Sequence, residues 1–202
     1  MGKLLIINGS PRAARSNSKK FAEIVEACWP GETDSYWAVS GKHEAVCQKL
    51  EKYEHIMFVF PLYADTIPAV LIGFLKYFEK AALSENVKIH VIINCGFLEP
   101  WQNDTALKTM RYFCERNHMA FGMALKIGGG EAVMGTPFSF LVKRKIRKTV
   151  KMAVMGKSRT LSVSMPISKG MFLKASRKYW LNYGNRFHVT EEQMRTMKIE
   201  DM

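Results

Sequence analysis

Over roughly the first 130 residues, short apolar runs alternate with longer stretches whose apolar residues recur every three or four positions. The runs have the pattern of strands buried on both faces, and the longer stretches have that of amphipathic helices. Strands that alternate with helices form a parallel sheet covered by helices on both faces. The predicted strands are residues 3–8, 34–39, 55–60, 87–93 and 119–127, and the predicted helices are residues 17–28, 44–53, 68–82, 101–117 and 137–155.

The order of these strands follows from chain geometry. Right-handed crossovers place five such strands in the order 2-1-3-4-5, which defines a doubly wound α/β domain. We expect this domain to occupy residues 1–156, because the pattern becomes irregular beyond Gly156. Residues 157–202 are predicted to form a basic helical C-terminal extension, packed on the same domain or on a partner subunit. Within it we expect a helix at 172–183 that Gly184 ends, and a last short helix capped by Thr190 and Gln193.

The positive charge of the chain is concentrated in its second half. The 202 residues carry a formal net charge of +12, yet residues 1–100 hold 11 basic and 11 acidic side chains, whereas residues 101–202 hold 19 and 7. No carboxylate side chain occurs between Glu131 and Glu191, where 13 Lys or Arg residues lie. This block should bind an anionic partner or lie near one.

Several partners of the basic block remain open. The simplest interpretation is the solvated side of the predicted helix 137–155. Attraction of NADPH phosphates, of an acidic redox partner or of a facing subunit is an alternative, and peripheral membrane contact is a less favoured one. No nucleic-acid partner is expected, because no recognised nucleic-acid-binding module is present.

Composition points to a cytoplasmic protein without a metal. No apolar run is long enough to cross a bilayer, and the first residues lack the pattern of a secretory signal. The four cysteines form no C-x-x-C pair, and the five histidines show no metal-binding spacing. We therefore expect reduced thiols and no metal site.

The first predicted strand ends in a run of small polar residues, Asn8-Gly9-Ser10-Pro11-Arg12, which Ser16-Asn17-Ser18 follows at the start of a helix. Hydroxyls, an amide, the arginine and free N–H groups at a helix N-terminus together suit a phosphate. The same residue types also cap helices without any ligand, so both interpretations remain open. The candidate phosphate-binding residues are Ser10, Arg12, Ser16, Asn17 and Ser18.

Two other nucleotide-binding loops are disfavoured. No Gly-Lys-Ser/Thr closes the run, as an ATP-binding P-loop requires, and Pro11 and Arg12 stand where G-x-G-x-x-G needs glycine. An ATPase and a Rossmann dehydrogenase are therefore less favoured.

A second loop follows the third predicted strand, with the sequence PLYADTIPA from Pro61 to Ala69, and Lys76 comes later. Together with NGSPRAARSNS, these residues resemble the NADPH-dependent FMN reductase and flavodoxin-like NAD(P)H oxidoreductase family, over roughly residues 1–130. The resemblance implies a flavodoxin-like fold with the FMN phosphate in the first loop. It also implies that Pro61, Leu62, Tyr63 and Ala64 lie along the isoalloxazine ring, a wall that suits a flavin. Asp65 is expected to point away from it.

The loops after the fourth and fifth strands complete the candidate site. The resemblance brings Asn94, Cys95 and Gly96 to the polar edge of the ring, with Cys95 as a small buried residue and not as a catalytic thiol. The glycines at 128–130, Gly129 among them, free the backbone for a close approach to a ligand, although a flexible turn is an equal alternative.

The resemblance implies an FMN-dependent NAD(P)H oxidoreductase that passes hydride or electrons to a small acceptor such as a quinone, a nitro compound or a flavin. The cofactor carries this chemistry, so no catalytic side chain is expected. Homodimers are common in the family. One alternative is a non-enzymatic flavodoxin-like electron carrier or flavin-binding module. Another is the same fold without flavin, which uses its basic third to bind membrane or nucleic acid.

Overall fold

A computed structural model describes residues 2–81, 83 and 86–197 of the chain. The chain divides into two compact units, Met1–Met165 and Pro166–Met202. The first unit contains the sheet, and the second contains two helices.

The sheet of the first unit has six parallel strands in the order β2-β1-β3-β4-β5-β6. The predicted order of the first five strands is confirmed. A continuous apolar run such as LLII at Leu4–Ile7 forms an inner strand because both of its faces are covered. The bounds are β1 Leu4–Asn8, β2 Thr33–Trp37, β3 His55–Pro61, β4 Lys88–Asn94, β5 Ala120–Ile127 and β6 Thr160–Val163.

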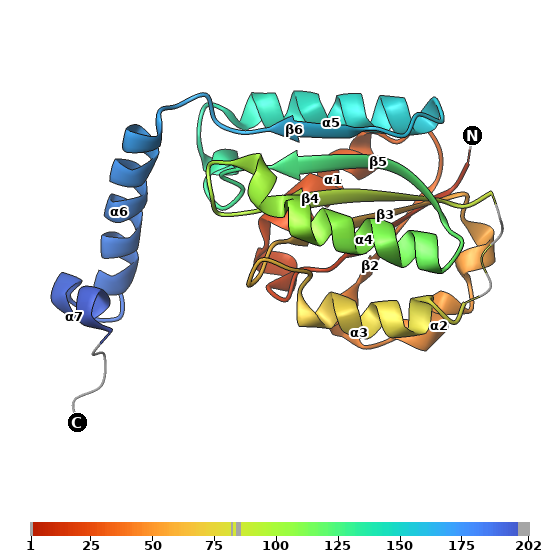
Figure 1. The fold of residues 1–202 in the computed structure, drawn as a ribbon, viewed down its shortest axis with the longest axis horizontal. Coiled ribbons are helices and arrows are strands. Elements are labelled where there is room, and N and C mark those ends of the chain that lie inside the picture. The colour runs from red at the N-terminus through yellow and green to blue at the C-terminus, as the bar shows by residue number, and fades with distance from the viewer. Residues whose placement is uncertain (1, 82, 84–85, 198–202) are drawn as a thin grey trace. The chain divides into compact units, whose positions relative to one another are not determined.

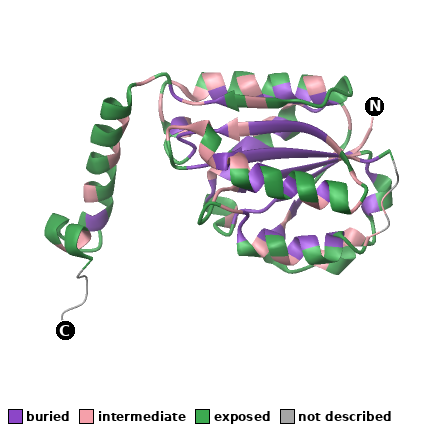
Figure 2. Cartoon of the chain, viewed as in Figure 1, coloured by how far each residue is buried: buried purple, intermediate pink, exposed green. Residues whose placement is uncertain are grey.

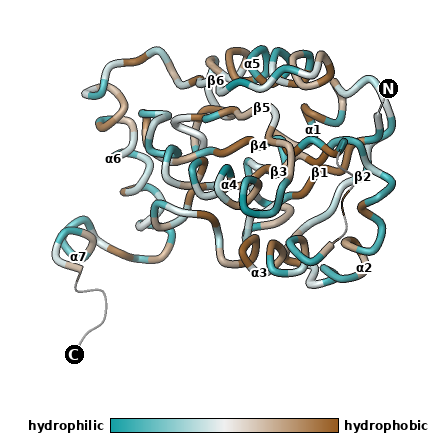
Figure 3. The backbone as a smooth tube through the Cα atoms, turned by 45° about the vertical axis from the view of Figure 1, so that its right-hand side comes forward, coloured by the Kyte–Doolittle hydropathy of each residue, from teal (hydrophilic) through white to brown (hydrophobic). Residues whose placement is uncertain are grey.

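Helices cover both faces of this sheet (Figure 1). On one face α1 (Asn17–Cys28) packs against α5 (Ser139–Val154), and on the other lie α2 (His43–Cys47), α3 (Ala69–Phe78) and α4 (Asp104–Arg116). In Figure 3 hydrophobic and hydrophilic stretches alternate along α5, as in a helix with one buried side. Short 3-10 helices are η1 Ala13–Arg15, η2 Ala38–Ser40, η3 Leu50–Lys52, η4 Pro100–Asn103 and η5 Val133–Gly135.

The core lies between the sheet and its helices, where Figure 2 shows the strands as the most buried part of the chain. Phe58, Phe74 and Phe78 form a cluster with ring centroids 5.4–6.2 Å apart. Each ring is fully buried. Such rings bury more area than aliphatic side chains, so this cluster fixes α3 against the sheet.

The sequence analysis missed β6 and ended the first unit too early, at residue 156. The unit runs to Met165, because Thr160–Val163 adds a sixth strand beside β5. Thr160 and Ser162 are exposed, and only Val163 of the four residues is buried. A short, half-polar edge strand has no continuous apolar run, which was the signal used to find the other five.

The second unit contains α6 (Lys169–Asn185) and α7 (Glu191–Thr196). The first of these helices ends at Asn185, two residues beyond the predicted end at Tyr183. Gly184 lies inside α6, where a Cβ atom would come 2.8 Å from the Met194 sulfur, so its missing side chain lets α7 approach. The predicted cap of α7 is confirmed, since the side chains of Thr190 and Gln193 form a reciprocal capping box. The predicted helix end at Ala82 and residues 198–202 lie outside the described residues.

At a bulge between β4 and β5, a buried histidine accepts the hydrogen bond of a backbone N–H group. His90 on β4 lies opposite two residues of β5, Gly122 and Met123, and its Nδ1 accepts a hydrogen bond from the Met123 N–H at 2.9 Å. Its Nε2 therefore carries the proton and faces Nδ1 of His55 at 3.1 Å. Burial lowers the pKa of His90 to about 3, with a further contribution from His55.

This pair predicts a loss of stability in mild acid. The unfolded His90 takes up a proton below about pH 6.5, whereas the folded one does not until near pH 3, so its contribution is complete above pH 6.5 and is lost as the pH falls. We expect the free energy of unfolding to fall by about 2 kcal/mol between pH 7 and pH 5, as measured by urea denaturation. A flat profile over that range, or an NMR titration of His90 near pH 6.5, would contradict this account.

Candidate functional site

Four loops meet at one edge of the sheet. The loops after β1, β3, β4 and β5 all begin at the carboxyl ends of parallel strands, and in open α/β sheets ligands bind at this edge. Contacts between the loops, described next, hold them in one constellation.

The first loop is shaped by its own polar side chains. Oδ1 of the buried Asn8 accepts a hydrogen bond from the Ser10 N–H at 2.9 Å, and the Ser10 hydroxyl accepts one from the Arg12 N–H at 3.3 Å. The Ser16 hydroxyl donates to the Ala13 carbonyl at 2.7 Å and caps α1 by accepting from the Lys19 N–H at 3.1 Å. The capping interpretation is therefore correct for Ser16, whereas Ser10 keeps its hydroxyl proton free to donate.

Two predicted phosphate-binding residues contact the fourth loop. The Asn17 amide donates to the carbonyls of Gly130 and Glu131, at 2.8 Å each. The Arg12 guanidinium forms an ion pair with the Glu131 carboxylate at 3.0 Å. The sequence analysis did not include Glu131 in the site, since a pair separated by 119 residues leaves no pattern along the chain. These contacts bring the first and fourth loops together.

Asn94, the last residue of β4, joins the loops at the centre of the edge. Its buried amide donates to the Ser18 hydroxyl at 3.2 Å and to the Phe60 carbonyl at 3.1 Å. The backbone carbonyl of Asn94 accepts a hydrogen bond from the Leu62 N–H at 2.7 Å. One residue therefore links α1, the end of β3 and the second loop, and Pro61 pairs with it in the sheet register.

The second loop is a tight turn. Tyr63 and Thr66 exchange two backbone hydrogen bonds, at 3.1 and 3.0 Å, around Ala64 and Asp65. Both central residues are left-handed, with φ of 45° and 57°, which is the conformation of a type I′ turn. Tyr63 is 42% exposed, so it presents its ring on the surface of the edge. Ala64 and Asp65 are exposed at the tip.

The third loop buries Cys95 and exposes Gly96. The Cys95 sulfur accepts a hydrogen bond from the Asn103 amide at 3.3 Å. Burial raises the pKa of the Cys95 thiol, so the group stays protonated at neutral pH and is a poor nucleophile.

The fourth loop is held against the third by backbone contacts. The N–H groups of Gly129 and Gly130 donate to the carbonyls of Phe97 and Cys95, at 2.5 and 2.7 Å. Gly129 has a φ of 63°, and a Cβ atom at Gly128 would lie 2.2 Å from the Leu98 carbonyl oxygen. The glycines thus allow a close approach of two protein backbones, and their predicted approach to a ligand stays a prediction.

The floor of the first loop contains an unused donor. Among the described residues, the buried Nδ2 of Asn8 has no hydrogen-bond partner. Its orientation is fixed, because Oδ1 accepts from a backbone N–H. The first N–H groups of α1, at Asn17 and Ser18, also lack intrahelical acceptors by helix geometry. An anionic group at this turn would satisfy such donors, so the residues present fit a phosphate.

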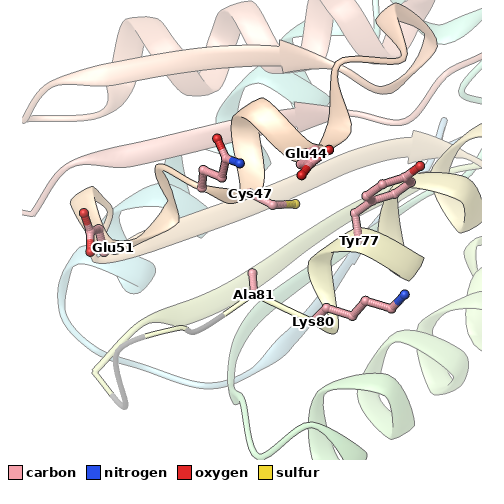
Figure 4. Close-up of a pocket in the computed structure, with 7 residues that line it drawn as sticks. Glu44, Cys47, Glu51, Tyr77, Lys80 and Ala81 are labelled. Atoms are coloured by element: carbon pink, nitrogen blue, oxygen red, sulfur yellow. The ribbon is translucent and has the colours of Figure 1, made fainter.

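A groove between α2 and α3 is a separate feature (Figure 4). None of the residues that line it comes from the four loops. Its thiol, Cys47, has a pKa raised to about 11 by burial, which leaves it unreactive at neutral pH. Acidic and basic side chains occur together along it, so it shows no preference for an anionic ligand. The lining residues are Glu44, Cys47, Gln48, Glu51, Tyr77, Lys80 and Ala81.

Comparisons with known proteins rest on structure alone, because no family model and no curated protein matches the chain. It is similar to an FMN-dependent NADH-azoreductase from Bacillus anthracis, with 15% identity and a TM-score of 0.56 over 78% of this chain and 100% of that one. It is also similar to a flavodoxin from Fusobacterium nucleatum bound to flavin mononucleotide, with 10% identity and a TM-score of 0.59 over 77% and 98%. The fold is flavodoxin-like.

A third similar structure is an NAD(P)H:quinone oxidoreductase from Methanothermobacter marburgensis, with 12% identity and a TM-score of 0.57 over 74% of this chain and 94% of that one. The fold that the sequence resemblance implied is thereby confirmed. Among the residues that the structure describes, no helix of either unit is long and apolar enough to cross a bilayer.

The packing at the carboxyl edge of the sheet predicts a steric effect of a substitution at Gly130. A Cβ atom there would lie 2.7 Å from the Cβ of Asn94, which is fixed in the sheet, whereas one at Gly135 in the same segment would meet nothing within 4 Å. We expect Gly130→Ala to lower the free energy of unfolding by about 1–3 kcal/mol, as measured in urea. Gly135→Ala is the matched control and should change it by less than about 0.5 kcal/mol. Equal effects of the two substitutions would show that Asn94 does not constrain the fourth loop.

Proposed function

We propose that this chain binds FMN at the carboxyl edge of its sheet and is an NAD(P)H-dependent flavin oxidoreductase. The observation that carries the proposal is the convergence of the four loops on Asn94 and on the Gly130–Glu131 segment. Residues that were selected from separate parts of the sequence are thereby neighbours. The FMN-dependent azoreductase and the quinone oxidoreductase of similar fold support the same activity.

In this proposal the first loop holds the phosphate of FMN. Ser10 offers a hydroxyl proton, Asn8 an unpartnered amide, and α1 its first N–H groups. Ser16 shapes the loop as the cap of α1, and Ser18 is positioned by Asn94. These neutral donors can hydrogen-bond the phosphate oxygens without a positively charged side chain.

Arg12 and Asn17 can contact the phosphate in the proposed site, and they also hold the fourth loop against the first. Both also bind the fourth loop, so a phosphate competes there with the carbonyls of Gly130 and Glu131. Arg12 neutralises the Glu131 carboxylate, which would otherwise repel an anion at this turn.

The second, third and fourth loops surround the proposed ring site. Leu62, Tyr63 and Ala64 offer an apolar and aromatic wall, next to Pro61 at the end of β3. Gly96 leaves room for backbone contacts and Gly129 holds the fourth loop against the third, while Cys95 stays protonated and neutral beside them. The ring thus meets a surface without a charged reactive side chain, as suits a cofactor that carries the chemistry.

FMN, when bound, supplies hydride and single-electron transfer, with NAD(P)H as the reducing co-substrate. The side chains of this chain bind, orient and shield it, and we assign none of them a catalytic role. The proposed acceptor is a small molecule such as a quinone, a nitro compound or a flavin. We further propose a cytoplasmic homodimer whose basic second half attracts the phosphates of NADPH.

Replacing a phosphate donor tests the first loop. Ser10→Ala should weaken FMN binding by at least about tenfold, because a hydrogen bond to a charged group contributes about 1.5–3 kcal/mol. Riboflavin has the same ring without the phosphate, so its affinity should not change. Tyr63→Ala is the complementary variant and should weaken both flavins. Fluorescence titration measures all four affinities, and an FMN affinity unaltered by Ser10→Ala would remove this loop from the site.

The source of electrons separates the enzyme from a carrier, the alternative that the flavodoxin of similar fold favours. We expect the FMN-loaded protein to lose its visible absorbance when NADPH or NADH is added without oxygen, and to regain it when a quinone follows. Bleaching by dithionite but by neither nicotinamide would identify a non-enzymatic electron carrier. A protein that binds no flavin at all would overturn both.

A further inference from the structure

The second unit carries a continuous aromatic face. Tyr179, Trp180, Tyr183 and Phe187 lie on α6 and in the turn after it, and they are 44%, 49%, 44% and 62% exposed. Their ring centroids are 5.2–6.3 Å apart, so the rings contact one another along the helix. At the helical repeat, the partly exposed Phe172 falls on the same side.

The other helix of this unit borders the aromatic face at Trp180, which lines a pocket with Met194 and Arg195 of α7, and leaves the rest of the face uncovered. α7 packs on the side of α6 that carries Arg177 and Gly184, where Arg177 forms an ion pair with Glu191 and Gly184 contacts Met194. Among the described residues of the unit, Gly184 alone is buried. A unit of 37 residues is too small to enclose these five aromatic side chains by itself, so their burial requires a surface outside the unit.

The charge of α6 indicates what kind of surface this is. The helix holds Lys169, Lys174, Arg177 and Lys178 and no carboxylate. Lys174, Arg177 and Lys178 fall on the sides away from the aromatic face at the helical repeat, whereas Lys169, in the first turn, falls on the aromatic side. An aromatic stripe with a basic opposite side is the pattern of a helix that lies in a membrane interface, where Trp and Tyr are favoured.

We propose that the aromatic face of α6 binds the surface of a lipid bilayer rich in anionic lipid. The helix lies along the interface, because none of the described helices meets the requirements for a span. A second copy of α6 is a poorer partner, since each helix keeps three lysines beside the ion-paired Arg177 and two such helices repel one another. Nucleic acid is also a poorer partner, because base stacking and phosphate contact need aromatic and basic side chains on one face.

Vesicle flotation of the full chain tests the proposal. We expect the protein to float with vesicles made of equal parts of phosphatidylcholine and phosphatidylserine. It should float much less with vesicles of phosphatidylcholine alone, and binding to the anionic vesicles alone should weaken as the salt concentration rises. Failure to bind the anionic vesicles would overturn the proposal.

Two sets of variants separate the contributions. Trp180→Ala combined with Tyr183→Ala should lower partitioning by at least about tenfold, because it removes apolar area that enters the interface. Lys174→Gln combined with Lys178→Gln should lower it by about fivefold for each charge, and only on anionic vesicles. Tyr112→Ala on α4 is the control, since Tyr112 is 67% exposed but lies on the first unit, and it should change nothing.

The remaining outcomes each identify another partner of α6. Binding of single-stranded RNA that Trp180→Ala abolishes, without vesicle binding, would assign the face to nucleic acid. A Trp180-dependent dimer that does not bind vesicles would assign it to a second copy. A Trp180 shielded from acrylamide in the free protein would assign it to the first unit. Each of these results contradicts the membrane proposal, and the FMN spectrum of the same samples reports on the proposed flavin site separately.

Discussion

The architecture of the candidate site depends on one buried amide. The Asn94 side chain lies where β4 ends, and a buried polar group must find partners or lose several kcal/mol of stability. It finds them on α1 and on β3, while the backbone of the same residue holds the second loop. Gly130 can approach only because it lacks a side chain. The position of every loop is therefore tied to a single point at the centre of the sheet edge.

Backbone strain is concentrated around that point. Ala13, Ala64 and Asp65 have φ between 44° and 57°, a region that disfavours residues with a Cβ atom. All three lie in loops at the carboxyl edge, whereas the other described non-glycine residues with positive φ, His118, His188 and Met197, lie before β5 and in the second unit. Strained backbone persists only where the surroundings determine it, and it is frequent at ligand sites. The rigid sheet thus supports loops whose conformation local preference alone would not select.

The sequence predicted the elements whose signal is local and missed those that depend on contacts. The bounds of α1, Asn17 and Cys28, were predicted to the residue, because the polar cap at Ser16 directly precedes the apolar spacing that ends at Cys28. β6 was missed, because an edge strand needs only one buried residue, whereas the low helix propensity of Gly184 placed the end of α6 to within two residues. The loops of the site were found from residue types, whereas the link between Arg12 and Glu131 is a long-range contact that no spacing encodes.

The two units differ in how they treat aromatic side chains. The first unit encloses Phe58, Phe74 and Phe78 completely, so its stability is internal. The second unit leaves Trp180 and its neighbours exposed, so part of its stability must come from whatever covers them. A ligand that binds only the folded form stabilises that form by mass action. In the membrane proposal, binding of the aromatic face therefore stabilises the helical form of α6, whereas the flavodoxin-like unit folds around its own core.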